Sequence, residues 1–229
     1  MVVVHRPPSG IVHPTLDPDP QFYILEEEKE IFRIFTPGRY NTKALTFRDF
    51  GPLHRFDHHR PAHNSQPKID SQRGIYYAAL TLRTCLIEIF GDTGAIAIDK
   101  QKVARPIVTS PIKLLDLRGF RAIKAGSVAA VSMIRERNLT QEWSRYFYKR
   151  TNIYSLIDGL IYSSAHNGEE AIALYERAKN KLECPENNII DLNNRKLRSH
   201  IQKVARDHNM IVDYGSYSLK KEEASNFRL

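Results

Sequence analysis

Cysteine is scarce in this 229-residue sequence, which contains Cys85 and Cys184 and no others. Two thiols are too few for a disulfide framework or a cysteine-rich zinc site, and this usage is typical of a reduced compartment. No apolar run approaches the roughly 20 residues that a membrane-spanning helix needs. Residues 1–20 hold five prolines and only a short apolar run, unlike a signal peptide. We therefore expect a cytoplasmic protein with no membrane association.

The sequence also lacks internal repeats, but it has a marked excess of positive charge. Its formal net charge is +8, which favours an anionic partner such as a nucleotide, nucleic acid or an acidic protein. The charge does not distinguish among these partners. Much of it lies near the C-terminus, where a solvated face explains it equally well: Arg195, Lys196, Arg198, Lys203, Lys220 and Lys221.

A chain of this length can bury one substantial core, so we expect a single domain with extensions. Residues 1–30 are expected to form an extended arm and residues 31–180 the main domain. Residues 181–229 are expected to form a basic extension packed on or next to that domain, with a helix near 192–207 and a short strand near 210–213. The alternation of short strands and helices favours an α+β fold.

A change of hydrophobic period marks the most informative stretch. Residues 74–79, GIYYAA, are apolar and aromatic, which predicts a short buried strand. Apolar residues in 82–89 then follow the i, i+3, i+4, i+7 spacing of a helix that buries one face. Beside that face, Thr81, Thr84 and Glu88 form a polar strip. Glu88 is therefore either a catalytic carboxylate near the end of the strand or the solvated edge of an amphipathic helix.

Arg33 lies within Ile31–Phe35, an otherwise apolar run with strand character. A desolvated guanidinium needs anionic or polar partners, so Arg33 either serves a site or points to water from an edge strand. The next segment, 36–73, is rich in turns and has no clear period. Loops of this length are usually functional or disordered.

That segment concentrates residues that can bind metals: His54, Asp57, His58, His59 and His63. No pair of them has a convincing ligand spacing on a helix, and clustered histidines in polar loops are more often solvated. We therefore predict no metal site.

Further elements are predicted downstream: strands at 105–109, 112–117, 157–164 and 171–175, a helix capped by Ser127 and running to about Arg137, and a helix at 140–150. The strand at 157–164 ends in Ser163 and Ser164. Their hydroxyls either bond a ligand or close the following turn.

The order Arg33, Arg55, Tyr77, Glu88, Ser164 resembles the RES domain, a family named for its arginine, glutamate and serine. The motifs that carry the resemblance are FRIF at 32–35, HRFD at 54–57, YYAALTLRTCLIE at 76–88, DGLIYSS at 158–164 and the AIALYE that follows. The resemblance spans roughly residues 31–176. Asp57 departs from it, because the family often has asparagine at this position, and the loop between Arg55 and Tyr77 is long and histidine-rich.

Members of that family are typically toxins of bacterial toxin–antitoxin pairs. Their fold is similar to that of ADP-ribosyltransferases, with mixed, mainly antiparallel sheets and flanking helices, and they degrade NAD or transfer its ADP-ribose to a protein. The resemblance implies an enzyme with NAD as substrate and no true cofactor. It also implies a separate Xre-type antitoxin as partner, a homo- or hetero-oligomer, and contact with nucleic acid only through such an antitoxin.

The resemblance also implies roles for individual residues. Glu88 would be the catalytic carboxylate, assisted by Arg33 and Ser164. The NAD-binding residues would be Arg33 and Arg55 at the diphosphate, Tyr77 at the nicotinamide–ribose pocket, and Ser164 (or Ser163) at the ribose. Cleaving the nicotinamide–ribose bond passes through an oxocarbenium-like species, which a nearby carboxylate stabilises. Whether water, phosphate or a protein accepts the ribose stays open.

Two other classes compete with this interpretation. A nucleic-acid-binding module would use the basic C-terminal segment and the aromatic residues, and its binding would depend steeply on salt. A metal-dependent nuclease would use Asp57, His58 and His59. No named nucleic-acid motif is present in the sequence, which weighs against the first class.

Overall fold

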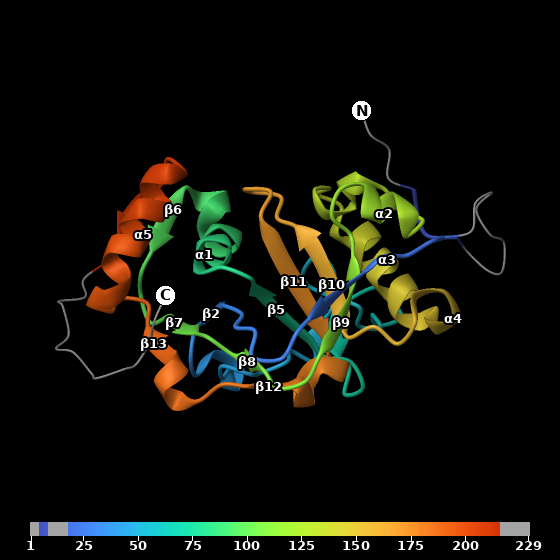
Figure 1. Cartoon of the computed structure of the whole chain (residues 1–229), viewed down its shortest axis with the longest axis horizontal. Coiled ribbons are helices and arrows are strands. Elements are labelled where there is room, and N and C mark those ends of the chain that lie inside the picture. Colours follow the sequence, from blue (N-terminus) through green and yellow to red (C-terminus); the bar gives the residue numbers. More distant parts are fainter. Residues whose placement is uncertain (1–4, 9–17, 216–229) are drawn as a thin grey trace.

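The computed structural model describes residues 5–8 and 18–215. Its central sheet has five strands in the order β1-β9-β10-β11-β5 (Figure 1). These strands are β1 (Phe22–Leu25), β5 (Ile75–Ala79), β9 (Ile112–Asp116), β10 (Gly159–Ser163) and β11 (Glu170–Tyr175). β9 and β10 are parallel, whereas the other neighbours in the sheet pair antiparallel. The expected α+β fold with mixed, mainly antiparallel sheets is confirmed.

A second group of elements lies on one side of this sheet and includes the C-terminal helix (Figure 1). Its members are α1 (Leu82–Phe90), α5 (Arg195–Asp207), β2 (Arg33–Phe35), β6 (Ala95–Ala97), β7 (Lys102–Ala104), β13 (Ile189–Asp191) and β14 (Ile211–Asp213). β7 pairs antiparallel with both β13 and β2, and β14 pairs parallel with β6. Leu197 and Ile201 of α5 are fully buried in the same apolar core as Leu86 of α1. A division of the chain at residue 180 would split this core.

Three helices cover the other side: α2 (Phe120–Lys124), α3 (Arg137–Lys149) and α4 (Thr151–Tyr154) (Figure 1). Their aromatic residues Trp143, Phe147 and Tyr154 are buried in a second core with residues of β10 and β11. Buried rings cannot serve as a stacking platform for bases. This packing removes part of the basis for a nucleic-acid-binding module.

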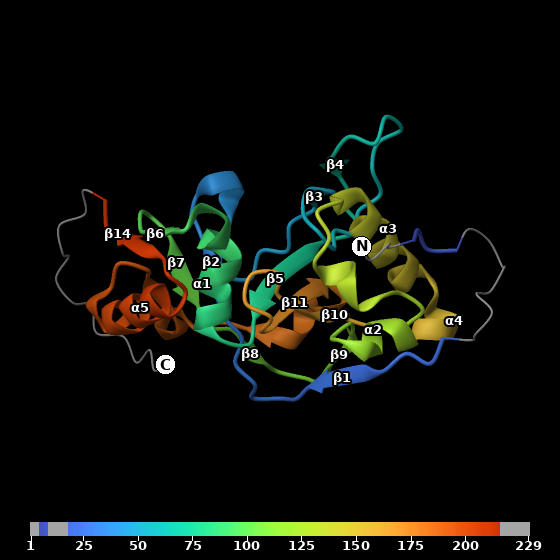
Figure 2. The same cartoon turned by 90° about the horizontal axis from the view of Figure 1, so that it is seen from above.

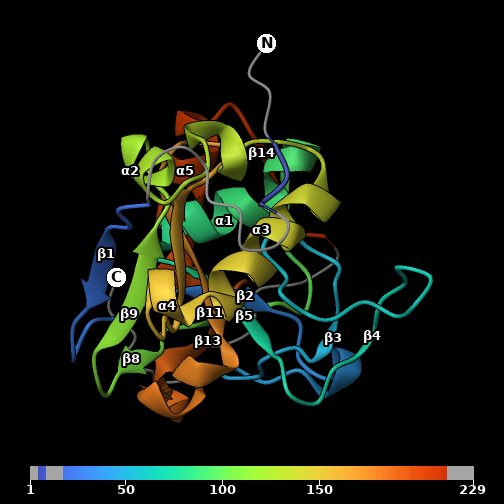
Figure 3. The same cartoon turned by 90° about the vertical axis from the view of Figure 1, so that its right-hand side faces the viewer.

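The long segment 36–73 contains little regular structure, in agreement with its turn-rich sequence. It includes a 3-10 turn at Arg39–Asn41 and a hairpin of β3 (Phe50–Gly51) and β4 (Lys68–Ile69). Figures 2 and 3 show this hairpin projecting from the body of the molecule. Elsewhere, β8 (Ile107–Val108) pairs with β12 (Leu182–Glu183), so the strand predicted at 105–109 is shorter than expected.

The predicted helix from Ser127 to Arg137 is wrong. This stretch holds a single 3-10 turn at Ala129–Ser132 that buries Val131, and α3 begins only at Arg137. One turn of apolar spacing suits a short 3-10 segment as well as an α-helix, because both bring residues three apart to one face. No helix was predicted at α2, a short helix between Gly119 and Gly126, two glycines with positive φ.

The extended arm predicted for residues 1–30 contains an edge strand of the central sheet. β1 pairs with β9 so that Leu25 lies opposite Ile112, and both side chains are buried. The first part of the arm, residues 1–4 and 9–17, lies outside the described residues. Residues 22–25 of the arm therefore belong to the central sheet, whereas His5 and Arg6 contact Trp143 and Glu142 of α3.

Candidate functional site

The free edge of β5 organises the candidate site. At one end of this edge, the backbone of Phe32 exchanges hydrogen bonds of 2.8 and 2.9 Å with Ala79. At the other end, the backbone of Arg48 exchanges bonds of 2.9 and 3.0 Å with Ile75. These contacts bring two segments that are distant in sequence to either side of Tyr77.

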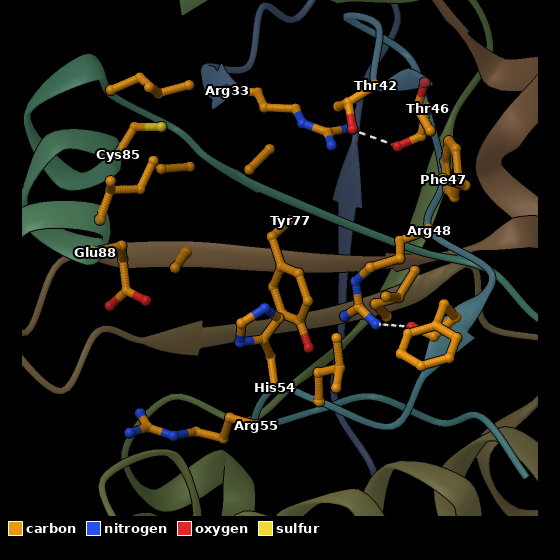
Figure 4. A pocket seen from close by; sticks show the side chains of 18 of the residues that line it. Arg33, Thr42, Thr46, Phe47, Arg48, His54, Arg55, Tyr77, Cys85 and Glu88 are labelled. Atoms are coloured by element: carbon orange, nitrogen blue, oxygen red, sulfur yellow. Dashed lines mark hydrogen bonds between the residues drawn. The ribbon is translucent and has the colours of Figure 1, made fainter. Parts of the chain in front are cut away.

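A cavity of about 860 Å³ opens beside this edge and reaches α1. Four of the five residues predicted from the sequence line it: Arg33, Arg55, Tyr77 and Glu88 (Figure 4). Its volume falls within the range of small-molecule sites, roughly 300–1,000 Å³. The structure thus brings together residues that are up to 55 positions apart in the sequence, from Arg33 to Glu88.

Glu88 enters the cavity from α1. The helix is capped by Thr81, whose hydroxyl accepts the Thr84 amide at 3.1 Å. Of the predicted apolar face it buries Leu82, Cys85 and Leu86, whereas Ile89 is exposed and lines the cavity. The polar strip divides: the Thr84 hydroxyl bonds Glu169, whereas Glu88 faces the cavity. The Oε1 atom of Glu88 is buried and has no hydrogen-bond partner among the described residues. Buried polar atoms are nearly always paired, so this oxygen is suited to contact a ligand.

Cys85, one turn before Glu88 on α1, also lines the cavity. Burial raises the pKa of its thiol to about 12. A thiol in that state stays neutral near pH 7 and is a poor nucleophile. Of these two side chains of α1, only Glu88 brings a carboxylate to the cavity.

The two predicted arginines enter the cavity from different sides (Figure 4). The Arg33 guanidinium donates to the Thr46 carbonyl at 2.7 Å and lies 4.3 Å from the centre of the Tyr76 ring. Arg55 donates to the Ser132 carbonyl. Arg33 therefore lines the cavity. The other interpretation of its sequence context, an arginine that points to water from an edge strand, does not describe it.

A network that the sequence analysis missed lies between these arginines. Asp57 is fully buried, and both of its oxygens accept hydrogen bonds of 2.8 Å from Nη2 of Arg48. The Tyr77 hydroxyl donates to the same carboxylate at 2.7 Å, as do the amides of Leu53 and His54 at 2.5 and 2.9 Å. The one sequence feature that could have predicted this network was Asp57 itself, an acidic residue at a position where the RES domain often has asparagine.

Both acidic groups of this network hold a defined protonation state. Burial by itself raises the pKa of Asp57, but the Arg48 charge and the two amides outweigh it and hold that pKa below its ordinary value. Burial, and then the Asp57 charge, raise the pKa of Tyr77 well above its ordinary value. Tyr77 thus remains a protonated donor to an ionised carboxylate.

Ser164 does not line the cavity. Its hydroxyl accepts the His166 amide at 3.2 Å, and its own amide donates to the Glu169 carbonyl at 2.7 Å, so it closes the turn between β10 and β11. Ser163 lies in β10 opposite Glu170 and does not line the cavity either. Tyr162 and His166 reach the cavity from this strand and turn. The ribose contact of Ser164 stays a prediction.

The histidines of the long loop have separate surroundings. His58 Nε2 lies 2.9 Å from Glu176 Oε2, His59 Nε2 lies 3.0 Å from the Arg48 carbonyl, and both rings are buried. His54 lines the cavity. Within the described ranges, no group of three or more His, Cys, Asp or Glu side chains could hold a metal ion. His58 thus ties the loop to Glu176 in the protein body, and His59 ties it to Arg48 within the same segment.

This arrangement suits a particular kind of ligand. A carboxylate oxygen without a partner stabilises developing positive charge, and arginine forks bind phosphate oxygens. The aromatic ring of Tyr77 between them offers a flat apolar wall. An anionic molecule that develops positive charge at one atom would therefore fit the cavity chemically.

In the described part of the chain, no helix combines the length and apolar character that crossing a membrane requires. No curated protein sequence matches this chain. Among solved structures, it is similar to the crystal structure of the M. tuberculosis MbcT–MbcA toxin–antitoxin complex, with a TM-score of 0.47 and 11% sequence identity, over 80% of this chain and 92% of that chain. The family model of the RES domain matches residues 30–195. The chain therefore belongs to the RES domain family.

Proposed function

We propose that this protein is an NAD-consuming enzyme that cleaves the bond between nicotinamide and ribose. The observation that carries the proposal is the unpartnered Glu88 oxygen, which faces a cavity that Arg33, Arg55 and Tyr77 also line. Membership of the RES domain family supports the same substrate.

In this proposal, the positive charge develops on the ribose beside Glu88. The bond between the ribose C1′ and the nicotinamide nitrogen breaks, and its electron pair leaves with nicotinamide, which becomes neutral. Departure of a neutral group needs no general acid, so a single carboxylate is sufficient. Arg33 and Arg55 bind the diphosphate, whose charge matches their guanidinium forks, and Tyr77 packs against the nicotinamide end.

The acceptor then forms a bond to C1′ and loses a proton to solvent. With water the enzyme is an NAD glycohydrolase, and with inorganic phosphate it is an NAD phosphorylase. With a side chain of another protein it is an ADP-ribosyltransferase, which we retain as the alternative. NAD is the substrate in each case and not a resident cofactor.

Depletion of NAD would make this protein the toxin of a bacterial toxin–antitoxin pair that acts in the cytoplasm. Its neutralising antitoxin would be a separate polypeptide, of the Xre type. Any contact with nucleic acid would then be made by that antitoxin.

The test is nicotinamide release from NAD by the purified chain, with and without inorganic phosphate. Glu88→Gln keeps the side-chain volume and removes the charge, so the rate should fall by about 100- to 1,000-fold. Glu169→Gln is the matched control, because Glu169 also contacts α1, through Thr84, but does not line the cavity. Equal rates for the wild-type protein and Glu88→Gln would refute the proposed role of Glu88. No release under either condition would refute cleavage with water or phosphate as acceptor.

A further inference from the structure

Arg48 has an unusual combination of surroundings for an arginine beside a ligand cavity. Its guanidinium lines the cavity near Tyr77 (Figure 4), yet it is clamped from behind by a fully buried carboxylate. Nη2 contacts both oxygens of Asp57, and Nη1 donates to the Phe50 carbonyl. An arginine has five N–H donors. The Nε hydrogen and the second Nη1 hydrogen have no partner in the described ranges.

The carboxylate of Asp57 accepts hydrogen bonds from side chains and from backbone amides. One oxygen accepts from Arg48 and Tyr77, and the other accepts from Arg48 and two backbone amides. Every group that bonds this carboxylate is therefore a donor. An ionised carboxylate satisfies four or five donors, whereas an asparagine amide must turn its NH₂ group toward some of them.

We propose that Arg48 is a ligand-contacting residue that donates to a phosphate oxygen of the nucleotide, and that Asp57 is the positioning residue that orients both Arg48 and Tyr77. The inference rests on the proposed function for the identity of the nucleotide. Arg48 would thus be a third anion-binding arginine beside Arg33 and Arg55, and Asp57 would hold it in position.

The charges explain why the pair suits a binding role. Asp57 neutralises Arg48, so the pair adds little net charge to the cavity. The pair instead supplies a guanidinium whose orientation Asp57 fixes before the ligand binds. Such a side chain loses less rotamer freedom on binding, which favours affinity. Arg33, which is bonded to a carbonyl rather than to a carboxylate, supplies the charge itself.

The experiment compares Arg48→Gln and Asp57→Asn with the wild-type protein. Loss of a charge-assisted hydrogen bond should raise the KM for NAD about tenfold or more in Arg48→Gln, with a smaller change in kcat. Asp57→Asn should change both the KM and the kcat, because it also weakens the hydrogen bond that holds Tyr77. The two effects should not add in the double variant, because both act on the same guanidinium.

Asp70→Asn is the matched control. Asp70 is a buried carboxylate in the same loop, clamped by two side-chain bonds from Arg60 and by the amides of Arg60 and Gln72. Unlike Arg48, Arg60 does not line the cavity. This variant should lose stability while its KM for NAD stays unchanged. If Asp57→Asn fails to fold, Arg48→Lys, which keeps the charge without the fork, replaces it and should also raise KM.

Binding of ADP-ribose, measured by calorimetry, separates this inference from the proposed function. If the wild-type protein releases no nicotinamide, the proposed activity fails, but weaker ADP-ribose binding by Arg48→Gln would still support the contact. An unchanged KM for NAD and unchanged ADP-ribose affinity in Arg48→Gln would overturn the inference. So would a KM for Asp57→Asn no higher than that of Asp70→Asn.

Discussion

Acid sensitivity of folding should depend on a buried histidine outside the cavity. His58 is fully buried, with Nε2 2.9 Å from Glu176 and its ring 4.6 and 4.3 Å from the rings of Tyr148 and Tyr175. Burial lowers its pKa from 6.5 to about 4, although Glu176 opposes the shift. His58 is therefore neutral in the folded protein at pH 7.

The direction of the pH dependence follows from proton uptake. Between about pH 6.5 and pH 4 the unfolded chain protonates at His58 and the folded protein does not, so stability falls as the pH falls. One pKa unit is worth about 1.4 kcal/mol, so the full difference is about 3.4 kcal/mol, of which about 2 kcal/mol is lost by pH 5. The pKa of Glu176 is lowered to about 2, because bonds from His58 and Tyr148 outweigh burial. Its own contribution is lost mainly below its ordinary value of 4.5, outside this interval.

Urea unfolding at about pH 7.5 and pH 5 measures this effect through the fluorescence of Trp143, the sole tryptophan. His58→Gln keeps a side-chain N–H for Glu176 but takes up no proton. The free energy of unfolding of the wild-type protein should fall between the two pH values by about 2 kcal/mol more than that of His58→Gln. His63→Gln, which changes an exposed histidine, should behave like the wild-type protein. If His58→Gln loses as much stability as the wild-type protein, the reasoning is refuted.

Three further substitutions test the packing and the site. Gly159→Ala would place a Cβ 2.4 Å from the Ala173 carbonyl oxygen, so it should lower the free energy of unfolding by about 1–3 kcal/mol or more. Urea denaturation measures this loss, and an unchanged midpoint would show that β10 and β11 can move apart to admit the methyl group. Ile201→Ala should lower the free energy of unfolding by about 2–5 kcal/mol, because Ile201 of α5 is fully buried in the core shared with α1. A far smaller loss would indicate that α5 only lies on the surface. Ser164→Ala removes a turn-closing acceptor and should cost about 1 kcal/mol of stability. Its rate of nicotinamide release should fall far less than that of Glu88→Gln, and an equal fall would indicate that Ser164 contacts the ligand.

Local periodicity predicted those parts of the fold whose signal lies within a few residues. The strand β5 and the helix α1 were predicted because alternation changes to a helical spacing between residues 79 and 82, and this placed Glu88 on the edge of a buried face. The same method failed between Ser127 and Arg137, where one turn of apolar spacing did not continue into a helix. Periodicity is informative only where it is sustained over several turns.

The sequence by itself determined the family, the α+β class and four of the residues that meet in the cavity, because short motifs and hydrophobic spacing are local properties. Only the tertiary structure decided that Asp57 clamps Arg48 and that His58 pairs with Glu176, 118 positions away. It also decided that the hydroxyl of Ser164 is used by its own turn. Such contacts depend on which segments the sheet brings together, and a hydrogen bond between distant residues leaves no periodic trace in the sequence.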